Sequence, residues 1–66
     1  GELTWHEILG QSRAFDARGN CVIEMTVDGR NLWCWAISRR QILASGRGVV
    51  DLDTAKSQAL AALAAL

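Results

Sequence analysis

The chain has 66 residues, half of them apolar, and its 7 basic side chains are balanced by 7 acidic ones. This length leaves room for one small core, and the zero net charge excludes long-range attraction to nucleic acid or an anionic membrane. No apolar run is long enough to span a membrane and no signal-peptide pattern is present, so we expect a cytoplasmic protein without a membrane partner. We expect residues 1–66 to form one domain, cut from a longer protein, because both ends look truncated.

A first helix is predicted near the start of the chain. Thr4 and Glu7 have the spacing of a capping box, and five side chains, most of them apolar, share one side at helical spacing. These side chains are Trp5, Ile8, Leu9, Ser12 and Phe15. Gly10 costs such a helix about 1 kcal/mol relative to alanine, so an extended segment over 11–15 is the alternative. The sequence leaves open whether residues 5–15 form a helix or a strand.

A β-hairpin is predicted over 21–37. Asp28-Gly29 is a dipeptide that two-residue type I′ turns prefer, and the flanking runs are rich in strand-forming residues. A turn of two residues fixes the register and sets Met25 opposite Leu32.

A third antiparallel strand is predicted over 41–47, after a two-residue turn at Arg39-Arg40. The resulting sheet has two largely apolar faces. One carries Trp33, Trp35, Ile37, Ile42, Ala44 and Gly46, and the other carries Cys21, Ile23, Met25, Leu32, Cys34 and Leu43.

A closing helix is predicted over 52–66, capped by Asp51 or Asp53, and its alanines allow it to lie close over the tryptophan face. The predicted fold is therefore a small α+β domain of the order α-β-β-β-α, with a three-stranded antiparallel sheet and the C-terminal helix packed on one face. The second apolar face then needs a cover, either the first helix or another subunit. The apolar end of the closing helix also suggests a further contact.

The polar residues do not form a pattern typical of an enzyme. His6 is the only histidine, and pairing it with Cys21 or Cys34 for catalysis would need further groups that the sequence does not supply. The spacing of the cysteines is not that of a zinc site. Gly46-Arg47-Gly48 lacks the lysine and further glycine of a phosphate loop. We therefore expect no enzymatic activity, no metal and no cofactor.

Three segments have the spacing of a known family: Trp5-His6-Glu7, Gly46-Arg47-Gly48, and Ala55-Lys56 with the alanines after it. With the predicted element order, they resemble the double-stranded-RNA-binding domain, which implies RNA contacts for Glu7 and Lys56. Acidic residues replace the basic cluster of that family at 51–53, and the 28–31 loop has no histidine. The resemblance therefore implies that most of the RNA-binding surface is lost and that protein contacts replace it.

We expect a non-enzymatic interaction module that binds another protein or a second copy of itself. Its predicted surface combines the apolar sheet face and the closing helix, namely Ile23, Met25, Leu32, Leu43, Leu60, Leu63 and Leu66. One alternative is binding of nucleic acid, double-stranded RNA in particular, through local charge at Glu7, Arg30, Arg39, Arg40, Arg47 and Lys56. A second alternative is a small antitoxin or phage-encoded inhibitor.

Overall fold

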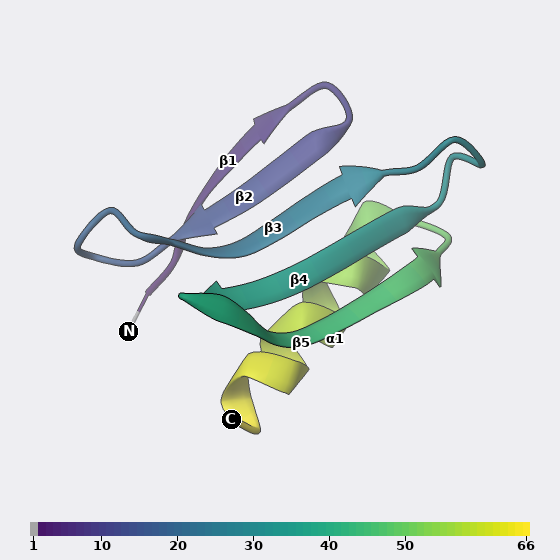
Figure 1. The fold of residues 1–66 in the computed structure, drawn as a ribbon. Helices are drawn as coiled ribbons and strands as arrows, with labels where there is room; N and C mark the ends of the chain where they lie inside the picture. The colour runs from purple at the N-terminus through teal and green to yellow at the C-terminus, as the bar shows by residue number, and fades with distance from the viewer. Residues whose placement is uncertain (1) are drawn as a thin grey trace.

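The computed structural model describes residues 2–66 and consists of a five-stranded antiparallel sheet with one helix on one of its faces (Figure 1). The strands lie side by side in chain order, so the turns alternate between the two ends of the sheet. The elements are β1 (Thr4–Ile8), β2 (Gln11–Phe15), β3 (Cys21–Val27), β4 (Trp33–Arg39), β5 (Gln41–Val49) and α1 (Leu52–Ala64). The predicted α-β-β-β-α order with three strands is wrong, whereas the α+β class and the C-terminal helix are correct.

The predicted first helix is a β-hairpin. β1 pairs with β2 from Thr4↔Phe15 to Ile8↔Gln11, which leaves Leu9 and Gly10 as a two-residue turn. Gly10 has a φ of 78°, a conformation that glycine adopts without strain and that the second turn position of a type II turn requires. The alternative of an extended segment over 11–15 is therefore the correct one, and it coincides with β2.

The register of the β3–β4 hairpin differs from the predicted one by three residues. Met25 lies opposite Trp35 instead of Leu32, because the connection runs from Asp28 to Leu32. The Asp28 carboxylate accepts hydrogen bonds from the amides of Arg30 at 2.8 Å and Leu32 at 3.1 Å, which stabilises this longer loop. A shift by an odd number of residues moves side chains to the opposite face. The sheet therefore has one apolar face instead of two.

The core lies between this apolar face and α1. Its fully buried side chains include Ile23, Met25 and Ile37 from the strands and Ala55 and Ala59 from the helix. The helix packs against β4 and β5, and the small alanines allow the close approach that the sequence predicted. The expected cover for a second apolar face is not needed, because the buried apolar side chains of the strands lie on the face that α1 covers.

The third predicted strand is present as β5, which is two residues longer than expected. Ala44 and Gly46 lie on the tryptophan face, as predicted, but they pair with Ile37 and Trp35, two residues away from the register that a two-residue turn would give. Ile42 pairs with Ser38 and is 66% exposed, because Arg40 alone forms the apex of the turn and the register shifts beyond it. The predicted place of Ile42 on the tryptophan face is therefore wrong.

Candidate functional site

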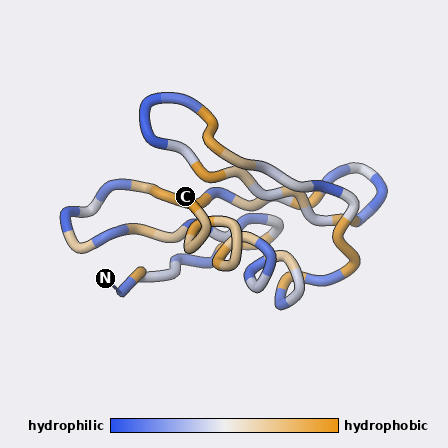
Figure 2. The backbone as a smooth tube through the Cα atoms, turned by 90° about the horizontal axis from the view of Figure 1, so that it is seen from below, coloured by the Kyte–Doolittle hydropathy of each residue, from blue (hydrophilic) through white to orange (hydrophobic). Residues whose placement is uncertain are grey.

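Three arginines from two different turns gather at one end of the sheet. Arg18 belongs to the connection between β2 and β3, Arg39 is the last residue of β4, and Arg40 forms the turn between β4 and β5. Both turns lie at the same end of the sheet, on the left in Figure 1, and the hydrophilic colour in Figure 2 is concentrated in such turns. The three side chains line one surface depression, together with Asn20 and Ser38. We call Arg18, Arg39 and Arg40 the arginine cluster.

The charges of the arginine cluster have no ion-pair partner within residues 2–66. The two ion pairs in this part of the chain join Arg13 to Glu24 and Lys56 to Glu7. Asp16 also lines the depression, but one of its carboxylate oxygens accepts hydrogen bonds from the backbone amides of Arg18 and Asn20, each at 2.9 Å. The amide of Asn20 makes the largest contribution to holding the pKa of Asp16 below its ordinary value. Asp16 therefore remains charged and organises the loop that carries Arg18.

The backbone at Arg40 is in the left-handed region, with a φ of 68°. This conformation costs a residue with a Cβ roughly 1 kcal/mol relative to glycine. Backbone strain of this kind is often found at binding sites. Arginine is therefore less favourable than glycine for the conformation of this turn, but it places a cation at the depression.

The C-terminal end of α1 lies beside the arginine cluster. Leu63 of the last helical turns lines a second depression with Arg18 and Arg39. The C-terminal end of a helix carries a partial negative charge, which favours nearby cations. The helix end therefore offsets part of the electrostatic repulsion among the three arginines, which have no carboxylate partner within residues 2–66.

The residues predicted to contact nucleic acid are divided by the fold. Arg39 and Arg40 lie in the arginine cluster, whereas Arg30 belongs to the β3–β4 loop and Arg47 to the C-terminal part of β5, at the opposite end of the sheet. The remaining two residues of that set are bound to each other: the Lys56 ammonium forms an ion pair with the Glu7 carboxylate. No continuous basic surface results.

Lys56 links the closing helix to the first strand. Its Nζ lies 4.7 Å from the ring centroid of Trp5, besides its ion pair with Glu7. Trp5 and Glu7 both belong to β1, so Lys56 connects the C-terminal helix to the first strand of the chain. A structural role therefore accounts for both positions that the family resemblance would assign to RNA.

The predicted apolar interaction surface is not continuous. Ile23 and Met25 are fully buried beneath α1, because the register shift turns them towards the helix. Leu32 and Leu63 are half-buried. Leu43, Leu60 and Leu66 remain exposed, the first on β5 and the other two in the C-terminal segment.

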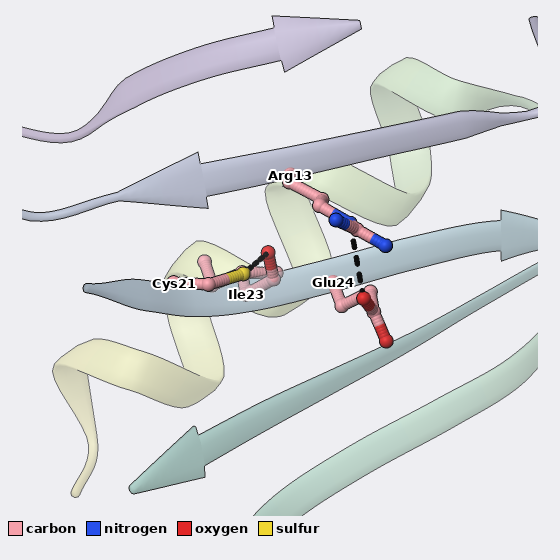
Figure 3. Close-up of polar contacts among 4 residues, drawn as sticks. All are labelled: Arg13, Cys21, Ile23 and Glu24. Carbon is pink, nitrogen blue, oxygen red and sulfur yellow. Dashed lines mark hydrogen bonds and ion pairs between the residues drawn. The ribbon is translucent and has the colours of Figure 1, made fainter. Parts of the chain in front are cut away.

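The face of the sheet opposite α1 is polar at its centre. Arg13 of β2 forms a 3.0 Å ion pair with Glu24 of β3, on the face turned away from the helix (Figure 3). The His6 and Phe15 rings meet edge to face on this side of the β1–β2 hairpin, with centroids 5.1 Å apart. Trp33 and Trp35 lie on the helix side and Trp35 is buried, so they form no open platform for stacking bases.

Residues 2–66 contain no group of three metal-ligating side chains close enough to hold an ion. Cys21 and Cys34 are free thiols, and burial contributes most to raising the pKa of Cys21, which disfavours the reactive thiolate. No helix in the described part of the chain combines the length and apolar character needed to cross a membrane.

Comparisons with protein-family models, with curated proteins and with solved structures give no match. The function of the chain must therefore be inferred from its geometry.

Arg18 is the member of the arginine cluster that the sequence reading missed. The feature that could have placed Arg18 in the cluster is the sheet topology. In an antiparallel meander, every second turn lies at the same end of the sheet. With a helix predicted over 5–15, the 16–20 turn had no strand before it, and nothing placed Arg18 beside Arg39-Arg40. The sequence becomes informative here only when residues 11–15 are read as a strand.

Proposed function

We propose that this chain is a non-enzymatic protein-interaction domain that binds an acidic segment of a partner through the arginine cluster. The supporting observation is that three arginines, from two neighbouring turns and the end of β4, line one depression without an ion-pair partner in residues 2–66. A guanidinium presents a planar fork of donors that matches a carboxylate in two-point hydrogen bonding. An acidic side chain in the depression would also relieve the repulsion among the three cations.

The compact shape of the cluster favours an acidic peptide segment over a nucleic-acid duplex. A duplex presents phosphates along an extended path, and binding it usually requires several cations spread over the surface. Here Arg30 and Arg47 lie at the opposite end of the sheet, and Lys56 is paired with Glu7.

The proposal can be tested with a short polyglutamate peptide added to isotopically labelled protein, followed by NMR. We expect amide shifts confined to 16–20 and 38–41, with no comparable change in the 28–32 loop. Replacing Arg39 and Arg40 by glutamine should weaken binding about tenfold or more, equivalent to about 1.4 kcal/mol. The matched control replaces Arg30 and Arg47 by glutamine, which removes the same charge from the opposite end and should leave binding unchanged.

Two outcomes would contradict the proposal. Equal losses for the two pairs of substitutions would show that binding follows total charge instead of the depression. Salt-sensitive binding of duplex RNA that exceeds binding of the acidic peptide would favour the nucleic-acid alternative.

A cytoplasmic location belongs to the same proposal. Both cysteines of the chain are free, one of them exposed. Free exposed thiols are typical of a reducing compartment.

A further inference from the structure

β5 forms one open edge of the sheet and is its longest strand, with 9 residues. Open edges present unpaired backbone donors and acceptors, and proteins often protect them with lysine or proline. β5 contains neither residue. It carries exposed Ile42 and Leu43 close to the arginine cluster, and Val50, which is 78% exposed, follows its other end.

We propose that the acidic partner is a second copy of this chain, joined by antiparallel pairing of the two β5 edges about a two-fold axis at Ser45. This inference rests on the proposed function, because it names the partner of the arginine cluster. Ser45 is the middle residue of β5, so a two-fold axis there pairs all 9 residues and sets Gln41 of one copy opposite Val49 of the other.

This register brings opposite charges together. The turn before β5, with Arg40 at its apex, then lies beside the segment that follows β5 in the second copy, which contains Val50 and Asp51. Asp53, exposed in the first turn of α1, follows two residues after Asp51. Arg40 of each copy therefore lies near the acidic start of α1 of the other, and two-fold symmetry forms this contact twice.

The same register covers exposed apolar side chains and aligns the irregular parts of the strand. Val50 of one copy reaches the position diagonal to Ile42 of the other, a distance at which side chains across an antiparallel pair interact. The pairing of β5 with β4 is irregular near Leu43 and again near Gly48. These irregularities lie on either side of Ser45, so the regular segment 44–46 falls at the two-fold axis.

The helices are compatible with this arrangement. α1 packs over β4 and β5, so a two-fold axis beside β5 would place the two helix axes about 10 Å apart, roughly two strand spacings. Helices that pack together are separated by about 8–10 Å. Lys56 marks the flank of α1 that faces β1, and the opposite flank carries exposed Thr54, Gln58 and Ala61, none of them bulky.

The test is the oligomeric state of the protein, measured by light scattering from micromolar to millimolar concentration. We expect a dimer that dissociates on dilution and with added salt, and a monomer for the variant Ile42→Lys. Arg40→Glu and Asp53→Arg should each weaken the dimer about tenfold, and the double variant should recover most of the loss. Recovery by the double variant separates a broken charge pair from a misfolded chain, and circular dichroism checks the fold of each variant.

A disulfide cross-link provides the geometric test. In a background with Cys21→Ser and Cys34→Ser, Ser45→Cys should form covalent dimers under mild oxidation with oxidised glutathione, because the axis sets Ser45 opposite itself. Thr4→Cys, exposed on the β1 edge, is the matched control and should cross-link slowly. Equal cross-linking of the two variants would overturn the inference.

A strict monomer at millimolar concentration would also overturn the inference, but it leaves the proposed function standing if the polyglutamate peptide still binds the depression. Conversely, a monomeric Ile42→Lys variant that fails to bind the peptide contradicts the proposed function itself. The two failures are therefore distinguishable.

Discussion

Replacing Gly46 by alanine should destabilise the domain through the Trp35 side chain. A Cβ added at Gly46 would lie 2.6 Å from Cε2 and 2.8 Å from Cζ2 of the Trp35 indole, well inside van der Waals contact. The indole has little freedom to move, because Trp35 is 8% exposed and its Nε1 donates a 3.1 Å hydrogen bond to Gln58 on α1. The substitution must therefore shift the helix, the ring or β5.

The magnitude follows from two opposing effects. Overpacking a core by one methyl group costs about 1–3 kcal/mol, and the loss of glycine's freedom in the unfolded chain returns about 0.5 kcal/mol. We expect a net loss of about 1–2 kcal/mol in the free energy of unfolding, which lowers the melting temperature by about 4–8 °C for each kcal/mol.

Thermal and urea unfolding followed by circular dichroism measure this loss. Gly29→Ala is the matched control: no atom lies within 4 Å of its added Cβ, and Gly29 does not have a positive φ. Its stability should stay within about 0.5 kcal/mol of the starting protein. In a Trp35→Phe background, the cost of Gly46→Ala should shrink, because the smaller ring leaves room for the methyl group. Equal stability of the two alanine variants would refute the close packing of the indole over Gly46.

Four further predictions concern single positions or groups. Ser12→Ala should leave stability unchanged or raise it by about 1 kcal/mol in urea unfolding, since the buried Ser12 hydroxyl has no hydrogen-bond partner. Lys56→Met should cost about 1 kcal/mol by removing the ion pair with Glu7 and the cation–π contact with Trp5, and stopped-flow unfolding should become faster. Arg40→Gly should raise the melting temperature by relieving the left-handed backbone, yet weaken binding of the polyglutamate peptide. Acid should destabilise the fold, because backbone amides lower the pKa of three aspartates, Asp16, Asp28 and Asp51. Their stabilising contribution is present above the ordinary pKa near 3.8 and is lost as the pH falls through the lowered values. A pH series of melting temperatures would detect this loss.

The closing helix was predictable because its determinants are local. The Asp51 side chain accepts a 2.7 Å hydrogen bond from the amide of Thr54, as an N-cap should, and Ala55 and Ala59 are buried at helical spacing. Each of these signals lies within one or two turns of the helix. They need no information about how distant segments pair.

The first hairpin was mispredicted because two local patterns competed over the same residues. Trp5, Ile8 and Leu9 have helical spacing, but in the structure Ile8 is 69% exposed and Leu9 lies in the turn. The buried positions of β2 are instead Ser12 and Ala14, small residues whose alternation carries a weak hydrophobic signal. The glycine that weakened the helix prediction was the better guide, because its positive φ forms the turn.

The β3–β4 register was mispredicted because Asp28-Gly29 was assigned to the apex of a two-residue turn. In the structure Asp28 begins a longer loop, and the residue with positive φ is Asn31, at 65°. Asn and Asp both tolerate or stabilise such loops, so the dipeptide alone does not determine loop length. The length of the loop determines on which face of the sheet Ile23 and Met25 lie. It therefore also determines which side chains are buried and which form the surface.

The register of the β3–β4 hairpin has a direct consequence for function. With Ile23, Met25, Trp35 and Ile37 all on one face, a single helix closes the core, and the opposite face can remain polar. A partner is then not needed to cover an apolar sheet face. The proposed binding instead uses the features that the helix leaves free, which are the turns and the open edge of β5. Arg40 and the start of α1 lie at opposite ends of that edge, so their charges can act locally although the chain as a whole is neutral.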